Sequence, residues 1–189
     1  MQTRTEKGGK NSEGPIGTGL VIERRFTTIG EDPFDQFDWI EMDVEIRNAD
    51  GSLAHRIDDV RLPSGFSGVA GKVLAQKYLR KAGVPAILRK VKEKGVPTWL
   101  QRSEPDHEKL QSLDPEKRFI GESHGRELFR RLAGTWTYWG WKHGYFEAEA
   151  DARAYFDEMC YLIASQRSAP NSPQSVSYTH LTLPTRSTG

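Results

Sequence analysis

The stretch that decides the fold runs from Arg126 to Gln174 and reads RELFRRLAGTWTYWGWKHGYFEAEADARAYFDEMCYLIASQRSAPNSPQ. Its second half carries apolar residues at three- and four-residue spacing, the pattern of an amphipathic helix: Ala152, Tyr155, Phe156, Met159, Leu162 and Ile163. Acidic residues open this pattern, where they complement the positive end of the helix dipole. Pro170 is predicted to end it, because the residue before a proline is displaced from helical geometry. We therefore predict a docked helix that delivers a rigid Pro-Asn-Ser-Pro turn.

Aromatic residues crowd the middle of this stretch: Trp136, Tyr138, Trp139, Trp141, Tyr145 and Phe146. Aromatic rings near basic residues can form a stacking platform for nucleic-acid bases. Hydrophobic packing is favoured instead, because the block has no excess of positive charge and each ring buries a large area. A separate helix is predicted before the block, starting at Ser123 and stopping at Gly134. Its inward side chains would be Leu128, Phe129 and Leu132.

Upstream, residues 37–62 show a period of two instead of a helical period. Ile40, Met42, Val44 and Ile46 alternate with polar neighbours, which describes a half-buried strand. The segment 48–51, Asn-Ala-Asp-Gly, supplies turn chemistry, and residues 52–62 would return as the partner strand. The sequence therefore predicts a β-hairpin.

A second helix is predicted after the hairpin. Ser67 can cap it, and it would run to about Ala82, with Gly83 and Pro85 as stop signals. Its buried stripe would contain Val69, Val73, Leu74 and Leu79, with Tyr78 beside them. Together with the hairpin and the helices further on, this gives an α+β fold: an N-terminal β-hairpin followed by a mainly helical domain.

Residues 77–94 are strongly basic, with Glu93 as their one acidic member. Such a surface could receive phosphates or an acidic partner. A solvated face that offsets the acidic residues of the hairpin is the favoured interpretation.

Three further groups of residues could form a metal or catalytic site: the acidic residues around the first strand, the histidines and Cys160. The acidic residues around the first strand could mark a metal site, but no histidine stands at ligand spacing, and solvated faces commonly produce such clusters. The histidines share no metal spacing and no nucleophile pattern, so surface or packing roles are predicted for His55, His107, His124 and His143. Cys160 has apolar neighbours and is predicted to be a small core residue.

The composition limits the classes of function. At 189 residues the chain has the length of one domain with tails. Its formal net charge of +1 gives no whole-molecule attraction to nucleic acid or membranes, and its mean hydropathy of −0.67 is polar. No apolar stretch has the length of a signal peptide or membrane span, so a cytoplasmic location is expected. A single cysteine cannot form an internal disulfide, which agrees with a reducing compartment.

The two ends differ in character from the domain at 21–174. Residues 1–20 have little to bury and are predicted to form a disordered arm, with a phosphate-binding tail as the less favoured alternative. Residues 175–189 read SVSYTHLTLPTRSTG, which we interpret as a non-native tail of the kind that a translated sequencing adapter produces. An authentic short C-terminal strand is the alternative.

Several blocks resemble, in one order, the N-terminal region of class II (adenosylcobalamin-dependent) ribonucleotide reductases. They are IERRFTTIGEDPFD at 22–35, IRNADGSLAHRIDDVRLP at 46–63, VLAQKYLRKAGVP at 73–85, GTWTYWGWKHGYF at 134–146, DARAYFDEM at 151–159 and SQRSAPNSPQ at 165–174. The resemblance covers Val21 to Gln174. Phe66 departs from it, since a tryptophan is expected there, and this departure concerns local packing.

The resemblance implies a ribonucleoside-diphosphate reductase in which this region precedes a ten-stranded α/β barrel. In that family adenosylcobalamin initiates a cysteine thiyl radical, the radical removes the ribose 3′ hydrogen, and a cysteine pair supplies the reducing equivalents. The implied partners are a ribonucleotide substrate, a deoxynucleotide effector and a thioredoxin-type reductant, with a homodimer as one arrangement of the parent; neither a membrane nor a nucleic acid is implied. Because the chain has one cysteine, we expect no catalytic residue in it, no turnover, and no cofactor binding by the chain alone.

One position is implied to contact substrate. By the resemblance, the serine of the Asn-Ser-Pro turn, Ser172, lies at the substrate site, where its hydroxyl and nearby backbone N–H groups could hold a phosphate or sugar oxygen. A turn that merely ends a helix is the alternative. Two other classes of function remain open: a stand-alone nucleic-acid-binding module that uses residues 77–94 and the tryptophans, and a structural helical module.

Overall fold

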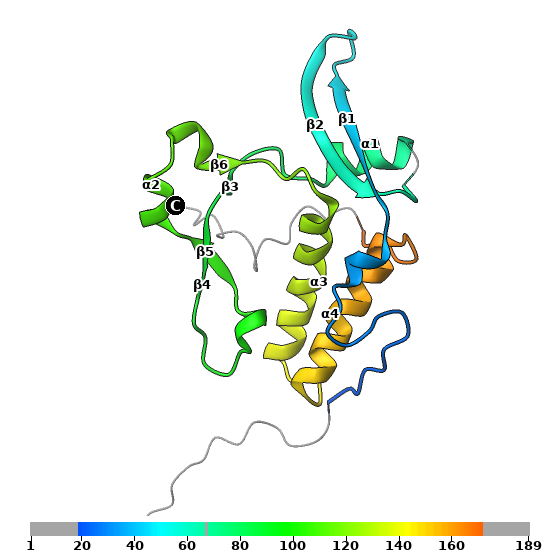
Figure 1. The fold of residues 1–189 in the computed structure, drawn as a ribbon, viewed down its shortest axis with the longest axis vertical. Helices are drawn as coiled ribbons and strands as arrows, with labels where there is room; N and C mark the ends of the chain where they lie inside the picture. The colour runs from blue at the N-terminus through cyan, green and yellow to red at the C-terminus, as the bar shows by residue number, and fades with distance from the viewer. Residues whose placement is uncertain (1–18, 67, 172–189) are drawn as a thin grey trace, which may run out of the picture.

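A computed structural model describes residues 19–66 and 68–171 (Figure 1). The predicted arm lies outside the described residues apart from positions 19 and 20, and Ser67, Ser172 and the predicted tail at 175–189 lie outside them entirely. The mixed α+β fold is confirmed. Its elements in chain order are η1 (Pro33–Gln36), β1 (Trp39–Arg47), β2 (Leu53–Pro63), α1 (Gly68–Lys77), β3 (Val84–Pro85), β4 (Leu88–Lys90), η2 (Thr98–Leu100), β5 (Ser103–Pro105), α2 (His107–Gln111), η3 (Pro115–Lys117), β6 (Phe119–Ile120), α3 (Gly125–Lys142) and α4 (Glu149–Ala164).

The predicted hairpin is confirmed. Strands β1 and β2 pair antiparallel, with Ile40 opposite Leu62 and Val44 opposite Ile57, and Gly51 in the connecting turn has a φ of 85°. Val44 and Leu62 are fully buried, so the alternation places one face against the core. The tip of the hairpin projects from the body of the molecule (Figure 1).

Helix α1 departs from the prediction in two ways. It ends at Lys77 instead of about Ala82, and Val69 and Val73, which were predicted to be buried, are 75% and 43% exposed. Leu74 and Leu79 are buried as predicted, and Gly71 and Ala75 take the places expected for the valines. Because a Cβ at Gly71 would lie 2.7 Å from the sulfur of Met42, the helix can approach the hairpin only through this glycine.

Helix α3 also corrects the prediction, because it continues through Gly134 to Lys142 and takes in most of the aromatic block. A glycine costs a helix about 1 kcal/mol relative to alanine, which is too little to end a helix that packs well. At Gly140 the packing needs the glycine, since a Cβ there would lie 2.7 Å from the ring of Phe146. The inward positions predicted for its first half are confirmed: Leu128, Phe129 and Leu132 are buried.

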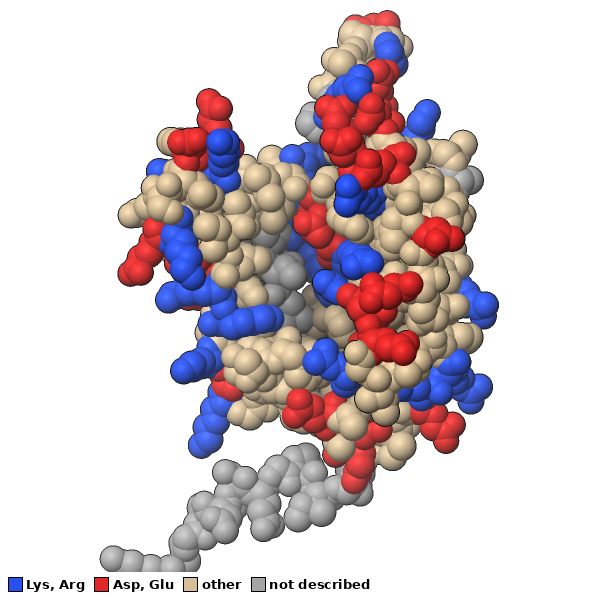
Figure 2. Space-filling model, in the orientation of Figure 1, with Lys and Arg blue, Asp and Glu red and all other residues tan. Residues whose placement is uncertain are grey.

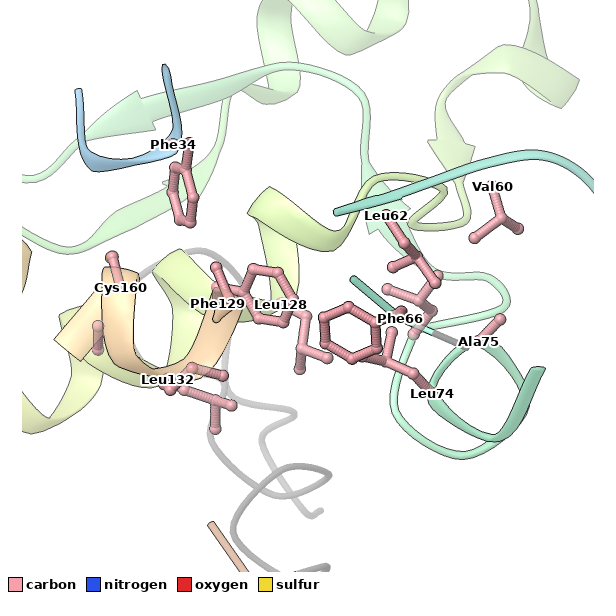
Figure 3. Packing of buried hydrophobic residues seen from close by; sticks show 14 of the residues in the cluster. Phe34, Val60, Leu62, Phe66, Leu74, Ala75, Leu128, Phe129, Leu132 and Cys160 are labelled. Atoms are coloured by element: carbon pink, nitrogen blue, oxygen red, sulfur yellow. The ribbon is translucent and has the colours of Figure 1, made fainter. Parts of the chain in front are cut away.

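Helices α3 and α4 lie side by side and form the main support of the core (Figure 1). Figure 3 shows the packing between side chains of α3, α4, α1, β2 and η1, including Phe129, Cys160, Leu74, Leu62 and Phe34. The predicted α4 stripe is confirmed in outline, with two members buried, Ala152 and Ile163, and two others packed against the core, Phe156 and Met159.

A second, smaller part of the chain lies across α3 from α4 (Figure 1). It contains two short antiparallel sheets, in which β3 pairs with β6 and β4 pairs with β5. The backbone joins it to the end of α1, since the N–H of Glu122 donates to the carbonyl oxygen of Arg80 at 2.7 Å.

Candidate functional site

The sequence-predicted site residue, Ser172, follows immediately after the last described residue, Asn171. Its own contacts therefore stay untested, but the backbone that leads to it is described. Helix α4 ends at Ala164, earlier than the predicted end at Pro170, because Gln166 takes a left-handed φ of 59°. The N–H groups of Arg167 and Ser168 then both donate to the carbonyl oxygen of Leu162, at 2.9 and 3.1 Å, and close the helix end.

Side chains tie this helix end to two distant parts of the chain. The amide nitrogen of Gln166 donates to the carbonyl oxygen of Gly65 at 2.8 Å, in the loop between β2 and α1. The guanidinium carbon of Arg167 lies 4.9 Å from the ring centroid of Phe26, and Phe26 stacks on Tyr161 at 5.2 Å. Gln166 and Arg167, at the end of α4, are thus each held by a contact with a different part of the chain. Such supporting contacts are needed to keep a functional turn in one position.

The other side of α4 carries a buried carboxylate that sequence reasoning missed. Glu158 accepts hydrogen bonds from the backbone N–H groups of Arg25, Phe26 and Thr27 and from the Thr27 hydroxyl, at 2.6–3.1 Å. Burial alone would raise the pKa of Glu158, but the hydrogen bonds from Thr27, Phe26 and Arg25 outweigh burial and hold the pKa below its ordinary value. This one side chain therefore fastens the segment before η1 along the helix.

Two further carboxylates of α4 hold the same segment. Asp157 pairs with Arg24 at 2.8 Å, and Asp151 accepts from the N–H of Ile22 at 2.9 Å. Burial raises the pKa of Asp157, and the contact with Arg24 only partly opposes this rise. The sequence did contain a sign of these carboxylates: Asp157 and Glu158 interrupt an otherwise apolar helical stripe. Buried carboxylates need hydrogen-bonding or charged partners, and those partners can be identified only from the tertiary structure.

A buried ion pair joins α3 to the segment that precedes it. Arg131 is completely buried, and its Nε and Nη2 donate to the two carboxylate oxygens of Glu122 at 3.1 and 3.0 Å. The same guanidinium donates to the carbonyl oxygen of Tyr78, and the N–H of Arg80 donates to Glu122. Burial and the neighbouring Arg131 lower the pKa of Arg80 to about 10. This cluster connects α3 with the residues that follow α1 and with the segment before α3.

The aromatic block makes contacts within the chain. The indole N–H of Trp141 donates to the carbonyl oxygen of Gly95 at 2.6 Å, and the hydroxyl of Tyr138 donates to a carboxylate oxygen of Glu93 at 2.7 Å. Burial, followed by the bond to Glu93, raises the pKa of Tyr138 to about 12. These contacts confirm the packing interpretation, because they attach the smaller part of the molecule to α3.

His124 has a structural role that the sequence did not reveal. Its Nδ1 accepts from the N–H of Arg126 at 3.2 Å, while Glu127 accepts from the N–H of His124 at 3.1 Å, which forms a reciprocal cap at the start of α3. Burial lowers the pKa of His124, and the nearby Arg126, Arg61 and Arg130 lower it further. Helix α3 therefore begins after His124 and not at Ser123.

The remaining candidate residues are the other histidines and Cys160. His107 and His143 are exposed, as predicted, whereas the side chain of His55 lies outside the described part. Cys160 is fully buried, and burial raises the pKa of its thiol well above the ordinary value, which confirms its role in the core. Within residues 19–66 and 68–171, no group of three or more His, Cys, Asp or Glu side chains is arranged to hold a metal ion.

The basic segment 77–94 is largely solvated. Lys and Arg side chains spread over the smaller part of the molecule (Figure 2), and Arg89 and Arg102 pair with Glu104 and Glu93. This distribution agrees with the favoured interpretation of a solvated face.

Comparison with known proteins supplies the identity of the whole region. The sequence profile of the family described as class II vitamin B12-dependent ribonucleotide reductase matches residues 41–166. The chain belongs to this family. It corresponds to the N-terminal region of class II ribonucleotide reductases, in agreement with the resemblance of its sequence blocks.

Individual relatives agree with the profile. The chain is 52% identical over 155 residues to the vitamin B12-dependent ribonucleotide reductase of Bradyrhizobium diazoefficiens and 50% identical to that of Agrobacterium fabrum. A Streptomyces avermitilis protein of the same name is 29% identical over 167 residues. The first two matches cover 82% of this chain and 12% of the relative, so the chain spans about an eighth of these curated proteins.

A cavity of about 610 Å³ lies beside α3 and α4, a volume in the range of sites for drug-sized ligands. No step of chemistry on the family's cofactor is assigned to the described residues. Across the described ranges, none of the helices has the length and apolarity that crossing a membrane requires.

Proposed function

We propose that this chain is part of an enzyme that reduces ribonucleoside diphosphates to deoxyribonucleotides with adenosylcobalamin and a cysteine thiyl radical. The observation that carries the proposal is the family match over residues 41–166 together with 52% identity to a relative named for this activity. Residues 21–174 would form the N-terminal domain, and a ten-stranded α/β barrel would follow it in the whole protein. Residues 175–189 would not belong to the native sequence.

Within that enzyme, the role of this domain is to position the Asn-Ser-Pro turn. Ser172 would hold a phosphate or sugar oxygen of the substrate. The anchoring of Gln166 to Gly65 and of Arg167 to Phe26 supports this role, because a rigid approach reduces the cost of ordering the turn when the substrate binds.

The radical chemistry requires cysteines that this chain lacks. The cofactor supplies the initiating radical, and the barrel would supply the reactive sulfurs. Cys160 cannot replace them, since it is fully buried in the core and its thiol pKa is raised. The 189-residue chain alone would therefore be inactive. The whole enzyme would work in the cytoplasm with a deoxynucleotide effector and a thioredoxin-type reductant, and it would form a homodimer.

A substitution in the full-length enzyme tests the role of Ser172. Ser172→Ala should raise the KM for the ribonucleotide by about tenfold, because the variant loses roughly one hydrogen bond to a charged oxygen. Ser168→Ala, four residues earlier in the chain, is the matched control and should leave the KM unchanged. An unchanged KM in Ser172→Ala would refute the assigned contact.

A turnover assay tests the predicted inactivity. The purified 189-residue chain, supplied with adenosylcobalamin, a dithiol and a ribonucleoside diphosphate, should form no deoxynucleotide, whereas the full-length enzyme should form it under the same conditions. Product from the short chain would contradict the proposal. A stand-alone nucleic-acid-binding role would instead predict oligonucleotide binding that weakens steeply with salt.

A further inference from the structure

A cavity of about 610 Å³ lies where the smaller part of the molecule meets α3 and α4. Its lining includes Arg130 of α3, Arg153 of α4, Lys90 of β4 and Trp99 of η2. Figure 2 shows basic side chains on both of these parts of the molecule. The cavity adjoins the first half of α4, whereas the turn before Ser172 follows the opposite end of that helix.

The charges around the cavity are only partly balanced. Four basic side chains line it, and two of them have carboxylate partners: Arg24 pairs with Asp157, and Arg130 pairs with Asp32. The other two, Lys90 and Arg153, form no salt bridge with the residues that the structure describes, and Arg153 senses the charge of Asp157 only at longer range. The remaining acidic side chain on the lining is that of Glu31, which is exposed.

Lys90 and Arg153 instead contact neutral groups. The Nζ of Lys90 donates to the carbonyl oxygen of Gln101 at 2.7 Å, and the guanidinium carbon of Arg153 lies 3.9 Å from the ring centroid of Trp99. Burial lowers the pKa of Lys90, as expected for an ammonium group that is partly removed from water without an anion beside it. An anion bound in the cavity would compensate both cations.

The rest of the lining is apolar. Trp99 contacts Phe156 edge to face at 5.8 Å, and its indole N–H donates to Glu149 at 2.8 Å, which fixes the ring. Leu100, Ile29 and Pro33 extend this apolar wall. A cavity of this volume with an apolar wall and a few placed charges has the usual properties of a small-molecule site.

We propose that this cavity binds a small organic phosphate, with the phosphate between Arg153 and Lys90 and an aromatic or other planar ring against Trp99 and Phe156. Two cations without carboxylate partners match the double charge of a phosphate monoester, and arginine binds such oxygens in a bidentate manner. The site goes beyond the proposed function, because it shares no residue with the turn that leads to Ser172 and requires no cofactor.

Calorimetric titration of the 189-residue chain with phenyl phosphate tests the site, with inorganic phosphate and phenol as parallel titrants. We expect saturable binding of phenyl phosphate and at least about tenfold weaker binding of each half-molecule, since either half lacks one set of contacts. No saturable binding of phenyl phosphate up to about 10 mM, well above the Kd of a useful site, would overturn the proposal. Inorganic phosphate that binds as tightly as phenyl phosphate would overturn the assigned ligand class.

Three variants locate the binding. Arg153→Gln and Lys90→Gln should each raise the Kd for phenyl phosphate by about tenfold, as the loss of one charged hydrogen bond does. Lys72→Gln, on the exposed side of α1, is the matched control and should bind like the wild type. Trp99→Leu should weaken the binding of phenyl phosphate but leave the binding of inorganic phosphate unchanged.

Because Arg153 is exposed and Lys90 is only partly shielded from water, their variants should keep the wild-type thermal unfolding midpoint, and they decide the outcome even if Trp99→Leu does not fold. Wild-type affinity in both Arg153→Gln and Lys90→Gln would place the ligand elsewhere and refute the site. All measurements use the chain without cobalamin and without turnover. Failure of this proposal would therefore leave the proposed reductase function untouched. Failure of the proposed reductase function would likewise leave the phosphate site untouched.

Discussion

The carboxylate of Glu158 accepts both the backbone N–H and the hydroxyl of Thr27, at 2.9 and 2.6 Å, across 131 residues of sequence. These hydrogen bonds hold the segment before η1 against the surface of α4. The same carboxylate accepts two further backbone N–H groups, so its loss leaves several buried donors without a partner.

Glu158→Ala should therefore lower the free energy of unfolding by about 3 kcal/mol, which is the scale for unsatisfied buried donors and a lost charged hydrogen-bond acceptor. Urea unfolding followed by circular dichroism measures it. Glu116→Ala, at an exposed position, is the control and should change the value by no more than about 0.5 kcal/mol. A Glu158→Ala variant as stable as the control would show that the segment is not held by this carboxylate.

His124 should make stability depend on pH. Its pKa lies below the ordinary value of 6.5 in the folded chain, so the unfolded chain takes up the proton first as pH falls. The free energy of unfolding should therefore decrease as pH is lowered through about 6.5, where histidine of the unfolded chain titrates. Protonation would also remove the Nδ1 acceptor that caps α3.

His124→Asn isolates this effect, because asparagine is a good N-cap residue that does not titrate. Urea unfolding at several pH values between about 5 and 7.5 should show a steeper loss of stability in the wild type than in the variant. Parallel pH profiles for the two proteins would contradict the role assigned to His124.

Two helical glycines should respond in opposite ways to alanine. Gly140→Ala should destabilise by about 1–3 kcal/mol, because the new Cβ would lie 2.7 Å from the Phe146 ring. Gly68→Ala, which meets open space at the start of α1, should be neutral or slightly stabilising, as helix propensity predicts. Thermal unfolding midpoints compare the pair, and a neutral Gly140→Ala would mean that the ring yields without cost.

The buried pair of Glu122 and Arg131 should be costly to break and less costly to replace. Arg131→Met should lower the free energy of unfolding by about 3–5 kcal/mol, because it leaves the buried carboxylate of Glu122 with only the longer ion pair to Arg80, at 3.9 Å. The double variant Glu122→Leu and Arg131→Met should recover part of this loss. A double variant that is as unstable as the sum of the two single variants would show that charge pairing is not the source of the effect.

Much of the fold follows from local patterns. The period of two over residues 37–62 predicted the hairpin, since alternate side chains of a strand share a face, and the spacing in the last helix predicted α4. The order of the sequence blocks was enough to recognise the family and to select Ser172 as the candidate contact, whose role stays a prediction.

Other features depend on contacts between residues far apart in the chain. Gly134 has the sequence signature of a helix stop, yet α3 passes through it, because packing against α4 outweighs a propensity cost of about 1 kcal/mol. The buried side of α1 was misjudged because Gly71, and not a valine, faces the hairpin.

The amino-acid sequence by itself determined the types of element, the family and the position of the candidate turn, because those depend on residue spacing along the chain. Only the tertiary structure decided the partners of Glu158 and the cavity between Arg153 and Lys90. Each of these joins segments that are distant in sequence, and a buried charge or an open cavity is defined by what surrounds it in space.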